Sequence, residues 1–278
     1  MKTLYVVATP IGNLADLTLR AIDTLKSCTR IVAEDTRHTR KLLSHLGIEG
    51  KSLDALHAHS TARDVAKIVE RLEAGEDVAL VSDAGTPIVS DPGAELVRAA
   101  IAAGVKVVPI PGPSAVLAAL VASGLGGGGG FRFFGFLPRD GSARRDAILA
   151  ICATPEPVVL YESPERVHET IGELAQATPK REACIARELT KVHEEMVRGT
   201  LELLRPMARL WRGEIVVVLG AHAPEAREAE IDDAQIDARI DEELAAGVHA
   251  KTIAEKIAAW SGRPKRAIYE RVVTRRAR

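Results

Sequence analysis

Residues 77–93 read DVALVSDAGTPIVSDPG. The stretch opens with a short run that is apolar at nearly every position, which is typical of a strand buried on both faces of a sheet. The twelve residues after it contain two glycines, two prolines and two aspartates, Asp83 and Asp91. Glycine lets the backbone approach a ligand, proline stiffens a loop, and carboxylates accept hydrogen bonds. The stretch therefore predicts a buried strand and a rigid loop suited to a cationic or hydroxyl-rich ligand, with a plain turn and helix cap as the alternative.

Comparable apolar runs recur along the chain, at residues 4–8, 105–109, 157–161 and 215–219. Helical patterns lie between them, for example at residues 61–74 and 93–103, and each ends near a glycine, as helices commonly do. Buried strands that alternate with helices predict an α/β fold.

Two further loops follow predicted strands, TPIGN at residues 9–13 and PIPGPSA at residues 109–115. In a parallel sheet the loops at the carboxyl ends of the strands face one ligand crevice, so three rigid loops indicate a shared site. Pro10 removes an N–H group that a phosphate would need, and neither loop reads G-x-G-x-x-G. The pattern therefore disfavours a dinucleotide-binding site or a P-loop, while ordinary turns remain the alternative.

Changes in composition divide the chain. Residues 126–130 are five consecutive glycines, which predict a flexible linker. We expect an N-terminal α/β domain over residues 1–120 and a second α/β domain over residues 121–222, with a cleft between them. A different kind of sequence follows and forms a third region, residues 223–278.

The C-terminal region is strongly asymmetric in charge. Residues 225–243 carry nine acidic and two basic side chains, whereas residues 261–278 carry seven basic and one acidic. Its pattern predicts helices at residues 233–246, 250–260 and 264–275, with a basic last helix that is similar to a helix-turn-helix. The alternatives are nucleic-acid contact, and a packing or dimerisation appendage with a solvated basic face.

The overall composition excludes several classes of protein. The 278 residues are 46% hydrophobic, 27% charged and 3% aromatic, which is the balance of a soluble globular protein. A net charge of −1 excludes a uniformly basic nucleic-acid coat. The three cysteines are far apart and the histidines show no ligand spacing, so we expect no metal site, reduced thiols and a cytoplasmic protein. No apolar stretch approaches the ~18 residues of a membrane span, and no signal peptide is evident.

Several motifs, in order along the chain, resemble those of one bacterial family. They are TPIGN (9–13), AEDTR (33–37), SDAGTP (82–87), PGPSA (111–115), ESP (162–164) and RELTK (187–191). These motifs resemble the ribosomal RNA small-subunit methyltransferase I family of the tetrapyrrole-methylase superfamily. The resemblance implies two α/β domains of the class III methyltransferase type with S-adenosylmethionine (SAM) between them, and a small C-terminal helical domain. It also implies methylation of the 2′-hydroxyl of a cytidine in the 16S rRNA of the small ribosomal subunit, and a homodimer.

The resemblance also implies roles for individual residues. Those expected to bind the cofactor are Pro10, Asp83, Gly85, Thr86, Pro87, Ser114, Ala115, Tyr161, Leu189 and Ile215. Methyl transfer is an in-line displacement, which needs alignment and a group that activates the hydroxyl. Lys191 and Glu188 are the catalytic candidates, because a lysine orients a hydroxyl or, where desolvated, accepts its proton. The alternative for both is a salt-bridged surface or a dimer contact.

RNA binding needs positive charge, which the sequence supplies locally. The candidates are Arg37, Arg144, Arg145, Lys265 and Arg266. Two alternative functions are a superfamily methyltransferase that acts on a tetrapyrrole or on a protein, as in diphthamide synthesis, and a helix-turn-helix regulator without enzymatic activity. The basic C-terminal region favours an RNA substrate over a small molecule, and the ligand-type loops favour an enzyme over a regulator.

Overall fold

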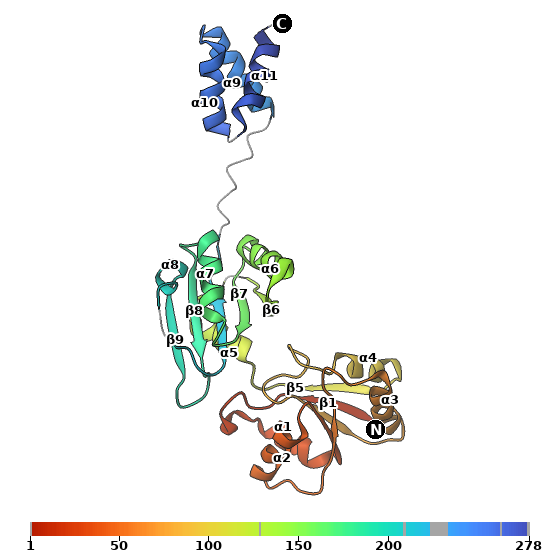
Figure 1. The fold of residues 1–278 in the computed structure, drawn as a ribbon. Coiled ribbons are helices and arrows are strands. Elements are labelled where there is room, and N and C mark those ends of the chain that lie inside the picture. Colours follow the sequence, from red (N-terminus) through yellow and green to blue (C-terminus); the bar gives the residue numbers. More distant parts are fainter. Residues whose placement is uncertain (1, 128, 208–209, 223–232, 262, 277–278) are drawn as a thin grey trace. The chain divides into compact units, whose positions relative to one another are not determined.

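The computed structural model describes residues 2–276 apart from residues 128, 208–209, 223–232 and 262. The chain forms two compact units, residues 1–222 and residues 223–278, and each has a hydrophobic core of its own (Figure 1). The first unit contains two five-stranded sheets, and the second contains helices.

The first sheet is parallel throughout, and its strand order is β3-β2-β4-β1-β5. Its strands are β1 (Thr3–Val7), β2 (Arg30–Ala33), β3 (Ser52–Ala55), β4 (Val78–Val81) and β5 (Lys106–Ile110). Strands β1, β4 and β5 confirm the apolar runs predicted from the sequence. The sequence did not predict β2 and β3, which are only four residues long.

Helices cover both faces of this sheet. Helices α1 (Leu19–Ser27) and α2 (Thr36–His45) pack on one face, after the short 3₁₀ helix η1 (Leu14–Asp16). Helices α3 (Ala62–Glu73) and α4 (Ala94–Ala102) pack on the other. A central strand such as β4 is therefore buried on both sides, which explains why it is apolar at every position.

The second sheet is mixed, with the order β6-β7-β10-β8-β9. Its strands are β6 (Arg132–Phe136), β7 (Val158–Glu162), β8 (Glu182–Arg187), β9 (Glu195–Thr200) and β10 (Ile215–Leu219). Strand β10 runs antiparallel to both β7 and β8, so it begins at the sheet edge where β7 ends. Residues on both sides of this edge can therefore line one site.

One helix covers one face of the second sheet and three cover the other. Helix α5 (Ala115–Ser123) packs against β10, β8 and β7. The opposite face carries α6 (Gly141–Ala153), α7 (Val167–Ala177) and the single turn α8 (Leu201–Leu204). The predicted domain boundary at residue 120 falls inside α5, which begins directly after a loop of the first sheet.

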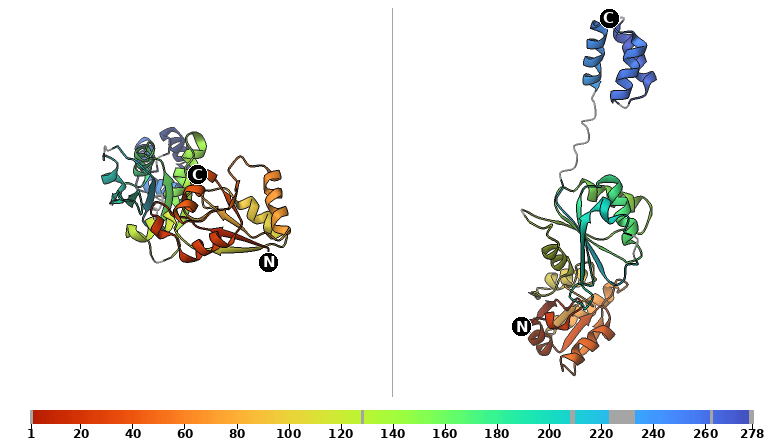
Figure 2. Two further views of the ribbon diagram at one scale, coloured as in Figure 1. Left: turned by 90° about the horizontal axis from the view of Figure 1, so that it is seen from below. Right: turned by 90° about the vertical axis from the view of Figure 1, so that its left-hand side faces the viewer.

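The C-terminal unit is a bundle of α9 (Asp233–Ala245), α10 (Ala250–Ser261) and α11 (Lys265–Arg276), drawn in blue in Figures 1 and 2. These helices confirm the three that the sequence predicts. Isoleucines from all three helices form its core. Much of the charge asymmetry is neutralised inside the bundle, because Arg271 and Arg275 of α11 pair with Asp233, Asp237 and Asp241 of α9.

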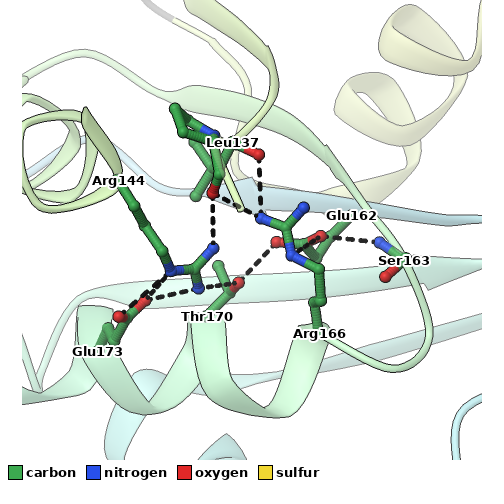
Figure 3. Close-up of polar contacts among 8 residues, drawn as sticks. Leu137, Arg144, Glu162, Ser163, Arg166, Thr170 and Glu173 are labelled. Carbon is green, nitrogen blue, oxygen red and sulfur yellow. Dashed lines mark hydrogen bonds and ion pairs between the residues drawn. The ribbon is translucent and has the colours of Figure 1, made fainter. Parts of the chain in front are cut away.

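A polar network supports the end of β7 (Figure 3). The buried carboxylate of Glu162 accepts hydrogen bonds from Thr170 Oγ1 at 2.6 Å and from the backbone N–H of Ser163 at 2.9 Å. Arg166 forms an ion pair with the same carboxylate at 3.4 Å and donates to the carbonyl oxygen of Leu137 at 2.9 Å. The network therefore ties the loop after β7 to α7 and to the segment after β6.

Arg144 extends the same network. Its side chain is 4% exposed and donates to Glu173 at 2.6 Å, to Thr170 Oγ1 at 3.0 Å and to the carbonyl oxygen of Pro138 at 3.2 Å. A buried guanidinium with these partners cannot reach a phosphate. This burial favours a structural role for Arg144 over the predicted contact with RNA, whereas the neighbouring Arg145 is exposed.

The burial of Arg144 predicts a stability effect that its neighbour does not share. We expect Arg144→Ala to lower the free energy of unfolding by about 3 kcal/mol, because it leaves the Glu173 carboxylate without its buried partner. The matched change Arg145→Ala removes an exposed charge and is expected to stay within about 0.5 kcal/mol of the parent. Urea denaturation followed by circular dichroism measures both. Equal effects of the two changes would contradict the structural role.

Candidate active site

Backbone hydrogen bonds join the loops after β1 and β4. The N–H of Thr9 donates to the carbonyl of Gly85 at 2.9 Å, and the N–H of Gly85 donates to the carbonyl of Thr9 at 3.0 Å. Thr9 Oγ1 donates to the carbonyl of Ser82, and Ser82 Oγ donates to the carbonyl of Gly85. Thr86 Oγ1 reaches the third loop, where it donates to the carbonyl of Pro113 at 3.1 Å. The three loops predicted to share a crevice are thus held together.

These loops and the adjacent edge of the second sheet enclose a pocket of about 330 Å³, which we call the main pocket. From the first sheet it is lined by Ile11, residues 84–86, residues 89–91 and Ser114–Ala115. From the second sheet it is lined by Phe136, residues 161–164 and residues 213–216. The antiparallel pairing of β10 with β7 explains why segments 50 residues apart meet there.

A smaller pocket of about 150 Å³ lies beside α2, and we call it the α2 pocket. Pro10 and Asp83 line it, whereas the adjacent residues Ile11 and Ala84 line the main pocket. The paired backbones of Thr9 and Gly85 therefore form a wall that the two pockets share.

Backbone strain is concentrated around the main pocket. Among the described residues, four that are not glycine have positive φ: Ile88 (76°), Ser90 (68°), Glu188 (52°) and Thr190 (67°). The first two belong to the loop after β4. The other two lie in the segment after β8, where the side chain of Lys191 packs against the backbone of Gly12. Each such conformation costs about 1–3 kcal/mol and typically marks a functional site.

One wall of the main pocket is acidic. Burial, together with the nearby carboxylates of Glu34 and Asp83, raises the pKa of Asp91 to about 6. The pKa of Glu34 is raised as well, by burial and by Asp83 and Asp35. Asp83 is fixed by a hydrogen bond that its carboxylate accepts from the N–H of Asp35 at 3.0 Å. This wall favours a ligand that carries positive charge.

The second sheet supplies an aromatic wall. Tyr161 makes an edge contact with Phe133, with ring centres 5.0 Å apart, and a tilted contact with Phe136 at 5.3 Å. Burial, together with Asp91 and Glu214, raises the pKa of Tyr161 to about 12, so its hydroxyl stays protonated. Phe136 is 59% exposed although it lines the pocket, so part of its ring surface is open to a ligand.

Lys191 and Glu188 lie together at the edge of the main pocket. Lys191 Nζ donates to Glu188 Oε1 and to Glu214 Oε2, both at 2.8 Å, and Glu214 lines the pocket. Burial opposes the charge of Lys191, but the hydrogen bonds to Glu188 and Glu214 raise its pKa overall. The hydrogen bond from Lys191 lowers the pKa of Glu188. A lysine held as a cation favours orientation of a substrate over proton acceptance.

The structure brings together six of the ten residues predicted to bind the cofactor. Those that line the main pocket are Gly85, Thr86, Ser114, Ala115, Tyr161 and Ile215. Pro10 and Asp83 line the α2 pocket instead. Leu189 is buried in the apolar cluster that also contains Ile11, and Pro87 lines neither of these two pockets. These assignments remain predictions.

Several lining residues were not predicted to bind the cofactor, namely Asp91, Phe136, Glu162 and Glu214. The sequence carried a signal for two of them, because Asp91 lies in the rigid loop after β4 and Glu162 begins the ESP motif. No local signal identifies Glu214, because it reaches the pocket only through the antiparallel position of β10.

The other predicted RNA-binding residues are exposed. The side chain of Arg37 is 84% exposed and pairs with Asp35, its helix-capping neighbour. Lys265 pairs with Glu255 at 2.6 Å, and Arg266 pairs with Glu270 at 3.2 Å while 92% exposed. Surface pairs of this kind are weak, so these cations can exchange partners with phosphates.

Within the described ranges, no three His, Cys, Asp or Glu side chains are placed to hold a metal ion. No helix in the part of the chain that the structure describes is long and apolar enough to cross a bilayer.

Comparison with known proteins places the chain in a family. Residues 3–204 match the family model for tetrapyrrole (corrin/porphyrin) methylases. The chain is 45% identical to a ribosomal RNA small subunit methyltransferase I of Xylella fastidiosa, over 96% of this chain and 97% of that protein. It is 46% identical to a protein of the same name from Mesorhizobium japonicum, over 97% of this chain and 91% of that protein.

A solved structure shows the same fold at lower identity. Uroporphyrin-III C-methyltransferase from Thermus thermophilus, complexed with S-adenosylhomocysteine, aligns with a TM-score of 0.56 and 21% identity, over 78% of this chain and 97% of that chain. These matches confirm the predicted fold class and, through the methylase family, the predicted cofactor, SAM. The chain therefore belongs to the tetrapyrrole methylase family, within the group of relatives named ribosomal RNA small subunit methyltransferase I.

Proposed function

We propose that this protein transfers a methyl group from SAM to the 2′-hydroxyl of a cytidine in the 16S rRNA of the small ribosomal subunit. One observation favours RNA as the substrate over a small molecule or a protein. The relatives named for ribosomal RNA match 96–97% of the chain, whereas the solved uroporphyrin-III methyltransferase leaves about a fifth of it uncovered. Residues 223–278 make up about a fifth of the chain. The 2′-hydroxyl of a cytidine is the acceptor that the resemblance implies, and a ribosomal substrate implies a cytoplasmic protein.

The main pocket suits SAM in size and chemistry. Its aromatic wall of Tyr161 and Phe136 offers surface for an adenine ring. Its acidic wall, with Asp91 at the pocket, complements the positive charge on sulfur and on the amino group. Ser114 and Ala115 begin α5, where backbone N–H groups are free to meet a ligand.

Bound SAM supplies a methyl group already activated by the positive sulfur. In the transfer, the ribose 2′-oxygen forms a bond to the methyl carbon while the carbon–sulfur bond breaks, and the hydroxyl proton passes to a base or to water. The chain's main task is to align oxygen, carbon and sulfur. We assign Lys191, held by Glu188 and Glu214, to orienting the acceptor at the edge of the main pocket.

Exposed cations supply the RNA-binding surface in this proposal. Arg37 and Arg145 belong to the first unit, and Lys265 and Arg266 belong to the basic helix α11. Arg271 and Arg275 are excluded from the RNA contact because they are engaged by aspartates of α9.

We also infer a homodimer, and α5 supplies a surface for it. The helix reads AVLAALVAS and is apolar around its whole circumference. Val116 and Ala119 are buried against the second sheet, but Leu117 is 52% exposed and Val121 is 79% exposed. An exposed apolar helix face of this kind typically marks a protein interface.

The first prediction concerns the reaction. We expect the purified protein to transfer labelled methyl from SAM to small ribosomal subunits that lack their modifications, and digestion to release the label as 2′-O-methylcytidine. Label in a different nucleoside would replace the proposed acceptor. If the RNA carries no label although the protein still binds SAM, the alternative substrates, a tetrapyrrole or a protein, would be favoured instead.

A shortened chain tests the role of the C-terminal unit in the same assay. A protein that ends at His222 keeps the whole first unit and its core. We expect its SAM affinity to stay within twofold of the full chain, while methylation of the subunit falls at least tenfold. Full activity of the shortened protein would limit the C-terminal unit to a packing role.

The second prediction concerns the charge of Asp91. Because its carboxylate faces the main pocket, Asp91→Asn is expected to weaken SAM binding about tenfold, which corresponds to about 1.4 kcal/mol. Binding of S-adenosylhomocysteine, whose sulfur is neutral, should change less than threefold. Calorimetry with both ligands measures the two affinities. Equal weakening of SAM and S-adenosylhomocysteine binding would contradict an electrostatic role for Asp91.

The third prediction concerns pH and stability. The pKa of Asp91 in the folded protein lies above its ordinary value, so the folded state binds this proton more tightly than the unfolded state. Ionisation of Asp91 above about pH 6 therefore lowers stability, and Asp91→Asn relieves that cost. With allowance for solvent screening, we expect Asp91→Asn to raise the free energy of unfolding by about 1 kcal/mol at pH 7.5, which raises Tm by about 2–4 °C. The gain should be smaller at pH 5. A lower Tm of the variant at pH 7.5 would contradict this sign.

The fourth prediction concerns the dimer. Val121→Asp places a charge on the exposed face of α5 and should convert the protein from a dimer to a monomer in light scattering. The control Leu149→Asp changes another exposed apolar residue, which is 64% exposed on α6, and should leave the mass unchanged. A parent protein that is already a monomer would refute the homodimer.

A further inference from the structure

The α2 pocket is distinct from the main pocket, to which we assign SAM. It lies across the Thr9–Gly85 wall from the main pocket, at the carboxyl end of β1. Its volume, about 150 Å³, is less than half of the 330 Å³ of the main pocket. It therefore admits a group of about one ring system and lies next to the main pocket, from which the wall separates it.

The lining of the α2 pocket combines apolar walls with polar groups. Pro10, Leu14 and Leu42 supply apolar surface, and Leu14 is 44% exposed at the entrance. His38 and Lys41 of α2 enter the lining from one side, and Asp83 enters it from the other. A flat base held against apolar side chains, with polar groups at its edges, is a common way to bind an unstacked nucleotide.

Positive charge surrounds this pocket on α2. The helix reads TRHTRKLLSH, which contains three residues with permanent positive charge and no acidic residue. Arg37, Arg40 and Lys41 are all exposed. Asp35 holds the guanidinium of Arg37, but neither Arg40 nor Lys41 forms an ion pair with any residue that the structure describes. The outer face of α2 thus offers two cations, Arg40 and Lys41, at a ring-sized pocket whose other charged lining residue is Asp83.

We propose that the α2 pocket binds the nucleotide that receives the methyl group, with Pro10, Leu14 and Leu42 against its ring and with Arg40 and Lys41 on the adjoining phosphates. The carboxylates of Asp83 and Asp91 repel phosphate, which keeps the RNA backbone outside while the neutral part of the nucleotide enters. The inference rests on the proposed RNA substrate and names its binding residues.

The test uses the full chain and the unmodified small ribosomal subunit. Lys41→Ala should raise the KM for the subunit about five- to tenfold and reduce by about one the slope of log binding constant against log salt concentration. Its SAM affinity should stay within twofold. The matched control Lys67→Ala removes an exposed lysine of α3, away from the pocket, and should change none of these quantities.

A second variant distinguishes binding of a nucleotide in the α2 pocket from general electrostatic attraction of RNA to α2. Leu14→Ser alters the pocket entrance without changing charge, so it should raise the KM several-fold and leave the salt slope unchanged. An unchanged KM in both Lys41→Ala and Leu14→Ser would overturn the inference while leaving the proposed function intact. Loss of SAM affinity in either variant would assign the α2 pocket to the cofactor and overturn it as well. No methyl transfer to RNA by the parent protein would refute the proposed function, and this inference with it.

Discussion

The pair of backbone hydrogen bonds between Thr9 and Gly85 is the constraint on which the site depends. These bonds hold the loop after β1 against the loop after β4 at the edge of the first sheet. A side chain at residue 85 would be strained, because its φ is +83° and a Cβ atom would approach Ile11 to 3.3 Å. Glycine is therefore required where the two loops meet. The resulting wall belongs to both pockets, so in the proposed arrangement it would set the distance between a bound donor and a bound acceptor.

The strained residues are stable because the elements behind them are rigid. Ile88 and Ser90 follow a strand that is buried along its whole length, and Pro87 and Pro92 limit the conformations of their loop in the unfolded chain. Glu188 and Thr190 follow β8, which is paired on both sides. The buried strands thus stabilise loops whose backbone conformation is strained, and those loops carry the groups that face ligands.

The sequence alone predicted five of the strands, among them β4 and β10, for a physical reason. A strand covered on both faces, such as β4 or β10, must be apolar at every position, whereas β3 lies at a sheet edge and carries Ser52 and Asp54. Such an edge strand has no distinctive pattern, and β2 begins with the charged residue Arg30, which leaves only three apolar positions. The loops after β1, β4 and β5 were expected to meet because parallel strands end at one edge.

Tertiary contacts distinguish residues that the local sequence does not. Arg144 and Arg145 are adjacent and identical in the sequence, yet only the first is covered by α7 and paired with Glu173. Glu214 contributes to the main pocket because β10 runs antiparallel to β7, which composition and spacing do not reveal. A local sequence pattern identifies the loops that carry a site, but the partner across the sheet decides which side chains enter it.

The distribution of charge fits the direction of the reaction. The acidic wall around Asp91 attracts a donor that carries a positive sulfur, and this attraction weakens when the sulfur becomes neutral after transfer. The same carboxylates repel an RNA backbone, so an RNA substrate requires cations outside the wall. Helix α2 provides them directly beside it, on a segment whose N-terminal cap, Asp35, is itself hydrogen-bonded to Asp83. A single hydrogen bond therefore connects the acidic wall that favours the donor to the basic helix that favours the acceptor.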